Sequence, residues 1–150
     1  MKTLIIGIIT ALAVSMAPAA AAKDRMPPDS KRYQLPECTG PCAPYYTKRA
    51  ERVLRCIAWR ESSFRWSVDG RYGSGAFQMI GSTSRAYARK LGLNAYASYR
   101  AASWPPAVQT FVAYAMLNAD PDKPGLEGLR HWSPVWASTI GASTYSCANA

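Results

Sequence analysis

Hydrophobic residues recur at helical spacing between positions 48 and 62. The apolar positions that fall on one helical face are Val53, Leu54, Ile57 and Ala58. Basic residues occupy the opposite face, which we interpret as solvated: Lys48, Arg49, Arg52 and Arg55. Thr47 precedes the segment and suits the N-cap position, where a side-chain oxygen accepts a backbone N–H. This pattern predicts an amphipathic helix over residues 48–62.

The helical spacing ends near residue 63, and glycines follow. Gly70, Gly73 and Gly75 predict a loop or a small β-ribbon over residues 64–77. Beyond it, we expect a second helix that runs to Gly92. Its expected caps are Ser82 or Thr83 at the start and Gly92 just after the end.

Two adjacent prolines, Pro105 and Pro106, suit the first turn of a third helix. Its expected buried side consists of Val108, Phe111, Val112, Ala115 and Met116. A turn over residues 118–125 ends this helix, and a shorter helix over residues 126–132 and a partly helical tail follow. Together these elements predict a small, mainly α domain of the α+β class, with one short β or loop excursion after the first helix.

Residues 1–22 have the composition of a secretory signal peptide. Lys2 supplies the basic start, residues 3–14 form an apolar run, and Ala20 to Ala22 suit a cleavage site. The apolar run is shorter than the roughly 20 residues that a membrane span needs. No Cys lies beside the cleavage site, so we expect no membrane anchor. The sequence predicts export to the periplasm, the cell wall or the medium, after cleavage near Ala22.

Residues 23–46 are rich in proline and show little periodicity. We expect them to form an extended arm that is ordered only near Cys38 and Cys42, ahead of a single domain over residues 47–150. The whole chain carries 18 Lys and Arg against 9 Asp and Glu, a formal net charge of +9. A basic protein attracts polyanions, and for an exported protein anionic cell-wall polymers fit better than nucleic acid. Ordinary solubilising charge explains the same count.

Four cysteines, an even number in a small exported chain, predict two disulfides. Cys38 and Cys42 are close enough in sequence to close a local loop, which leaves Cys56 and Cys147 to join the first helix to the tail. Three pairings are possible, and we favour this one. With His131 as the only histidine, a zinc site is disfavoured. We expect no metal and no cofactor, and the even cysteine count disfavours a thiol hydrolase built on Cys56 and His131.

Glu61 is the carboxyl group that the pattern singles out. It falls four residues after Ile57 and seven after Leu54, so it lies on the apolar face of the first helix, in its last turn. Apolar surroundings raise the pKa of a carboxyl group, which suits a general acid near neutral pH. An exposed Glu at a fraying helix end is the alternative. Asp69 is a weaker second candidate, because an Asp before Gly70 more commonly forms a turn.

The residues around Glu61 resemble the catalytic core of the soluble lytic transglycosylases. The resemblance rests on Glu61-Ser62-Ser63-Phe64, Gly75-Ala76-Phe77-Gln78-Met79 and Ser82-Thr83. The order Cys56, Glu61-Ser62, Trp66, Gln78-Met79 also resembles the resuscitation-promoting factors of actinobacteria, in which a Cys before the Glu pairs with one near the domain's end. Both groups belong to the lysozyme-like superfamily. The resemblance covers about residues 47–147 and implies a small lysozyme-like domain.

This resemblance implies cleavage of the β-1,4 bond between N-acetylmuramic acid and N-acetylglucosamine in peptidoglycan. Glu61 would act as acid on the leaving oxygen and then as base on the muramyl 6-hydroxyl, which forms a 1,6-anhydro end without a second carboxylate. Ser62 would support the site, Gln78 would line the groove, and Tyr114 would match a groove tyrosine. Trp66 and Tyr72, beside the glycine-rich loop, are candidate platforms for sugar rings.

Two further functions stay open from the sequence. One is a hydrolytic lysozyme in which Asp69 positions a water, since glycosidases usually need two carboxyl groups. The other is a cationic protein that binds the cell wall without turnover. In all three cases the expected partner is the peptidoglycan glycan strand, with other anionic wall polymers as possible additional partners.

Overall fold

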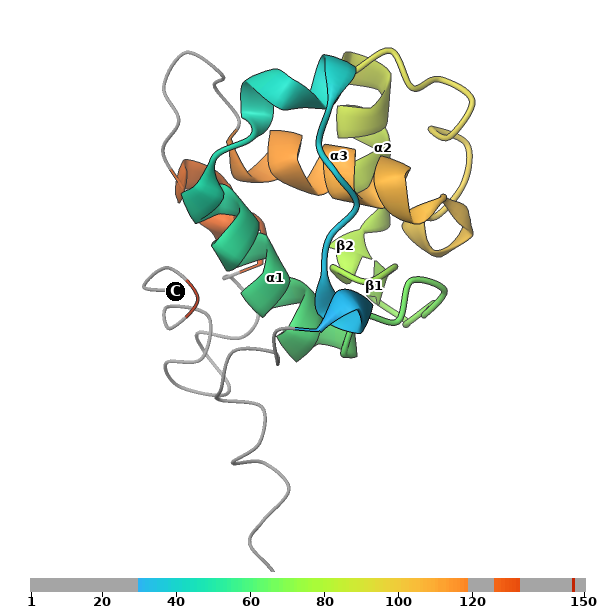
Figure 1. Cartoon of the computed structure of the whole chain (residues 1–150). Coiled ribbons are helices and arrows are strands. Elements are labelled where there is room, and N and C mark those ends of the chain that lie inside the picture. The colour runs from blue at the N-terminus through green and yellow to red at the C-terminus, as the bar shows by residue number, and fades with distance from the viewer. Residues whose placement is uncertain (1–29, 119–125, 133–146, 148–150) are drawn as a thin grey trace, which may run out of the picture.

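The computed structural model describes residues 30–118, 126–132 and Cys147 (Figure 1). The expected signal peptide over residues 1–22, the turn after Asn118 and most of the C-terminal tail lie outside the described residues. The described residues form three α-helices, a small two-stranded sheet between the first and second of them in the chain, and short 3-10 helices before the first, between the second and third, and after the third. The mainly α prediction with one short β excursion is therefore confirmed. None of the helices in the described part of the chain is long and apolar enough to cross a membrane.

Helix α1 spans Lys48–Ser62, as its hydrophobic pattern predicts. The Thr47 side chain accepts a hydrogen bond from the backbone N–H of Ala50 at 3.0 Å, which confirms Thr47 as the N-cap. The helix ends in a left-handed turn at Ser63 and Phe64, whose φ angles are 55° and 61°. A left-handed backbone costs an L-residue roughly 1–2 kcal/mol, so this sharp exit depends on the packing around it.

Strands β1 (Gly73–Ser74) and β2 (Met79–Ile80) form the antiparallel hairpin, with Gly73 opposite Ile80. The sheet thus reaches a few residues beyond the predicted ribbon. Glycine is required at 73, because a Cβ there would collide with the backbone of Gln78.

Helix α2 (Gly81–Lys90) follows β2 without a connecting loop. The prediction that Ser82 or Thr83 caps it is wrong: both lie inside the first turn, and the N-cap residue is Ile80, which makes no side-chain cap. The extended backbone of the strand leads directly into the helix, so no polar cap residue precedes it. The predicted end is confirmed, because Gly92 has a φ of 74° just after the helix.

Helix α3 (Pro106–Leu117) lies between α1 and α2 and also contacts the 3-10 helices η3 and η5 (Figure 1). Its predicted start at the proline pair is confirmed. Val112, Ala115 and Met116 are buried as predicted, whereas Val108 and Phe111 are only half-buried. The helix is covered on nearly all sides, because its buried residues also include Gln109, Thr110, Ala113, Tyr114 and Leu117. The predicted helix over 126–132 is present as the 3-10 helix η5 (Leu126–His131).

The described part of the N-terminal arm packs along α1, from η2 (Lys31–Tyr33) near its C-terminal end to η3 (Gly40–Tyr45) near its start (Figure 1). The Tyr33 ring meets Trp59 edge-on at 4.9 Å, and Arg55 Nε donates to the Tyr33 carbonyl oxygen at 3.1 Å. The expectation of an arm ordered only near its cysteines is therefore wrong. Its tyrosine supplies apolar surface that α1 needs to bury.

Both predicted disulfides are present. Cys38 and Cys42 have Cα atoms 5.1 Å apart, and Cys56 and Cys147 have Cα atoms 5.5 Å apart. The second bond fastens the helix that carries Glu61 to the C-terminal tail. Disulfides of this kind indicate an oxidising compartment outside the cytoplasm.

Candidate functional site

Glu61 lies in the last turn of α1, half-buried, at the end of the helix's apolar stripe. Leu54 and Ile57, which precede it on the same face, are 0 % and 2 % exposed. Directly after Glu61 the chain turns through the left-handed residues Ser63 and Phe64 toward the hairpin. Glu61 therefore lies on the apolar face of α1, as predicted, and the β excursion follows directly after it.

Ser62 connects the end of α1 to the loop between the strands. It is 2 % exposed, and its Oγ lies 2.8 Å from the carbonyl oxygen of Ala76 and 3.3 Å from that of Ala58. The hydroxyl proton is donated to the nearer oxygen, and Oγ accepts the backbone N–H of Arg65 at 3.0 Å. Ser62 therefore holds the Glu61 end of the helix against the segment 75–78 from inside the fold, rather than facing a ligand.

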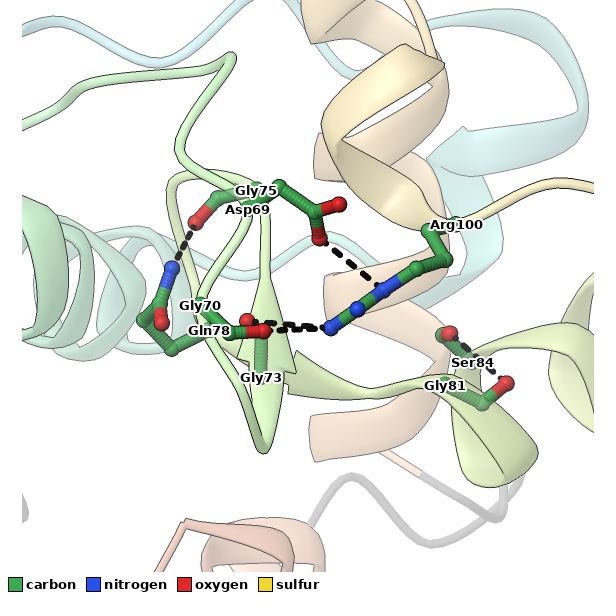
Figure 2. A network of polar contacts seen from close by, with 8 residues as sticks. All are labelled: Asp69, Gly70, Gly73, Gly75, Gln78, Gly81, Ser84 and Arg100. Carbon is green, nitrogen blue, oxygen red and sulfur yellow. Dashed lines mark hydrogen bonds and ion pairs between the residues drawn. The ribbon is translucent and has the colours of Figure 1, made fainter.

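Gln78 closes that segment with a left-handed backbone, φ 47°. Its Nε2 donates to the carbonyl oxygen of Gly75 at 2.9 Å, and the side chain is half-buried. A Cβ at Gly70 would lie 2.8 Å from Gln78 Oε1, so a larger residue there would displace the Gln78 amide. The amide is fixed across its own loop, and Figure 2 shows it directed toward Gly75.

Asp69 stands at the entrance to the hairpin and binds Arg100, a residue that the sequence did not indicate (Figure 2). Arg100 Nε lies 2.9 Å from Asp69 Oδ1, and Nη2 donates to the carbonyl oxygens of Gly70 at 2.6 Å and Gly73 at 3.5 Å. The side chain of Asp69 is 50 % exposed and that of Arg100 is 39 % exposed. This arrangement gives Asp69 an evident structural role: it orients the guanidinium group that ties together the two ends of the turn over residues 70–73, which leads into β1.

The two predicted sugar platforms differ in exposure. Trp66 is half-buried and meets Phe64 and Phe77 edge-on, with ring centroids 6.3 Å and 5.9 Å apart. Tyr72 is 77 % exposed in the turn that leads into β1, and the guanidinium of Arg71 lies 5.3 Å from its ring centroid. Tyr72 is consequently the side chain of the two that is free of core packing.

Buried polar groups that sequence reasoning missed hold the loop from the other side. Gln109, fully buried on α3, accepts the Ala76 N–H at 2.9 Å through Oε1. Its Nε2 donates to the carbonyl oxygens of Trp66 at 2.9 Å and Trp104 at 3.0 Å. Trp132 Nε1 donates to the Phe77 carbonyl oxygen at 2.8 Å. A glutamine within an apolar helix is the signal that could have revealed this anchor.

Tyr114 is not brought to Glu61. It is 1 % exposed, its ring centroid lies 5.9 Å from that of Tyr46, and both rings line a cavity with Glu51 near the start of α1. Ten residues of α-helix separate Glu51 from Glu61, which is about 15 Å along the axis. Tyr114 therefore belongs to the opposite end of the helix, and the structure does not support its assignment as a groove tyrosine beside Glu61.

Metal ligands are not grouped in the part of the chain that the structure describes, where no set of three or more His, Cys, Asp or Glu side chains could hold an ion. In comparisons with known proteins, no family model, no curated protein and no solved structure matches this chain.

Proposed function

We propose that this chain is an exported, lysozyme-like enzyme that cleaves the β-1,4 bond between N-acetylmuramic acid and N-acetylglucosamine in peptidoglycan. The observation that supports this most is the hydrogen bond from Ser62 to Ala76. It joins the helix end that carries Glu61 to the loop that carries Gln78, and these are the two motifs on which the resemblance to lytic transglycosylases depends.

Glu61 is the proposed acid and base. Its protonated carboxyl donates to the glycosidic oxygen as the bond to the muramyl C1 breaks, which releases the leaving sugar as an alcohol. The resulting carboxylate then accepts the proton of the muramyl 6-hydroxyl as that oxygen bonds to C1. The product is a 1,6-anhydro ring, Glu61 regains its proton, and no water is consumed.

The surroundings of Asp69 favour this single-carboxylate route over hydrolysis. A hydrolase needs a second carboxylate with room for a water beside the sugar. One Asp69 oxygen instead lies against Arg100 at 2.9 Å, in a contact that organises the hairpin. Tyr72, exposed in the turn that leads into β1, and Gln78 are the proposed sugar contacts. The net charge of +9 supports attraction to an anionic wall.

Mass spectrometry of digested sacculi tests the proposal. Purified protein should release muropeptides that end in 1,6-anhydro-muramic acid. Reducing-end products would mean hydrolysis, and the absence of release together with sedimentation of the protein with sacculi would mean binding without turnover. Either of these two outcomes would contradict the proposed formation of 1,6-anhydro ends.

A further inference from the structure

A cavity of about 320 Å³ lies between the N-terminal arm and the start of α1, apart from Glu61. Its lining includes Leu35, Pro36, Glu37, Tyr46, Glu51 and Tyr114. This volume is at the small end of the range for ligand sites, roughly 300–1,000 Å³. The Cys38–Cys42 disulfide lies in the same wall and stiffens it.

Glu51 supplies a fixed acceptor in this cavity. The Tyr46 hydroxyl donates to Glu51 Oε2 at 2.8 Å. That hydrogen bond, with smaller effects of burial and of the Glu51 charge, raises the pKa of Tyr46, so the phenol keeps its proton and the bond persists at neutral pH. A carboxylate accepts about four hydrogen bonds, so Glu51 retains capacity for a further donor. Glu37 places a second carboxylate at the same cavity.

Tyr114 supplies a donor that the described residues do not use. Its side chain is 1 % exposed, and its hydroxyl forms no hydrogen bond with any residue that the structure describes. Burial first, and the charge of Glu51 second, raise the pKa of Tyr114 well above its usual value, so it stays an O–H donor. Its hydroxyl oxygen is not one of the fully buried polar atoms that lack a partner, so it reaches the open space of the cavity. A buried ring whose O–H faces a cavity, with no partner among the described residues, offers a hydrogen-bond donor to a ligand.

We propose that this cavity binds the amino end of a peptide. The ammonium group would donate to the carboxylates of Glu51 and Glu37, and the neighbouring carbonyl oxygen would accept from the Tyr114 hydroxyl. A neutral sugar would leave the negative charge of two carboxylates uncompensated. A phosphate or another anion would be repelled by them. An ammonium next to a carbonyl group matches both the acceptors and the donor.

This inference does not depend on the catalytic assignment, because about 15 Å of helix separates Glu51 from Glu61. Two sources supply an ammonium group: a free peptide, at its amino end next to a carbonyl group, and the peptide stem of peptidoglycan, at a side-chain amine that is not cross-linked. In the second case the cavity would add recognition of the stem to the proposed cleavage of the glycan.

Titration of the full mature protein with alanyl-alanine amide, followed by NMR, tests the proposal without any turnover. Saturable shifts should appear at Tyr46, Glu51 and Tyr114. The N-acetylated peptide should bind at least tenfold more weakly, because acetylation removes the charge. Glu51→Gln should weaken binding at least tenfold and Tyr114→Phe at least threefold, with thermal unfolding showing that each variant is folded. Glu127→Gln, the same change in η5, is the matched control.

Equal binding of the free and acetylated peptides would overturn the proposal, as would shifts that avoid the cavity or an unchanged affinity in both variants. Shifts of the cavity residues with Mg²⁺ or Ca²⁺ alone, and none with peptide, would also overturn it. A muropeptide with a free stem amine, compared with its peptide alone, separates the sources. Tighter binding of the muropeptide would assign the stem as ligand, and equal binding would assign a free peptide.

Discussion

Gln109 Oε1 lies 2.9 Å from the backbone nitrogen of Ala76, and this contact joins α3 to the loop that also receives Ser62 from α1. Ala76 is therefore held through its N–H by one helix and through its carbonyl oxygen by another. Because Ala76 is fully buried, neither group has access to water as a substitute partner. The loop that carries Gln78 is thus positioned by two buried polar side chains rather than by its two-residue strands.

Replacing Gln109 with Leu should lower the free energy of unfolding by about 3 kcal/mol or more, because three backbone groups lose a buried partner at once. Urea unfolding measures this change. The neighbouring Thr110→Val is a matched control, since the Thr110 hydroxyl is buried without a partner among the described residues and its removal should be neutral or stabilising. Equal losses in both variants would mean that packing, not hydrogen bonding, accounts for the role of Gln109.

Ser62→Ala should cost about 1–2 kcal/mol of unfolding free energy, because the Ala76 carbonyl oxygen would keep its burial and lose its donor. Lysis of sacculi should fall as well, since the loop would be less well fixed against Glu61. Ser82→Ala is the control: Ser82 is exposed and caps nothing. If Ser62→Ala loses activity while its urea midpoint stays at the wild-type value, Ser62 acts on the substrate directly.

Local signals predicted α1 well, because Thr47, the apolar stripe and the basic face all lie within the helix itself. The hairpin and the arm were predicted less well, since their partners are distant in sequence: Arg100 for Asp69, and Trp59 for Tyr33. Tyr114 was assigned to the groove from the resemblance alone. A motif match does not tell which end of a neighbouring helix the residue meets, and Tyr114 meets the cavity beside Glu51.

Removing Cys56–Cys147 should destabilise the fold more than removing Cys38–Cys42. The two bonds close sequence separations of 91 and 4 residues. On the chain-entropy model these correspond to about 4–5 and about 2 kcal/mol, because a longer loop restricts the unfolded chain more. Urea unfolding of the two double alanine variants compares them. A larger loss of unfolding free energy in the variant without Cys38 and Cys42 would show that this disulfide stabilises the arm by more than its effect on the entropy of the unfolded chain.

Glu61→Gln should lower the rate of wall lysis by roughly 10²- to 10⁴-fold, because the amide keeps the shape of the side chain but cannot give and retrieve a proton. Its unfolding temperature should stay close to that of the wild type, which separates lost chemistry from lost structure. Release of soluble muropeptides over time measures the rate, with Glu127→Gln as the matched control. A Glu61→Gln protein that clears sacculi at more than about a tenth of the wild-type rate would mean that another residue is the acid.

Asp69→Asn separates the two enzymatic mechanisms. If the muramyl 6-hydroxyl is the nucleophile, the variant should still form mainly 1,6-anhydro ends, with a modest loss from the weakened Arg100 contact. That contact is solvent-exposed, so its contribution to stability should be no more than about 1 kcal/mol. Arg100→Gln should reproduce the same modest loss, because it disrupts the same contact from the other side. Were Asp69 to position a water, Asp69→Asn alone would lose most of the rate, Arg100→Gln would retain it, and the wild-type digest would contain reducing ends.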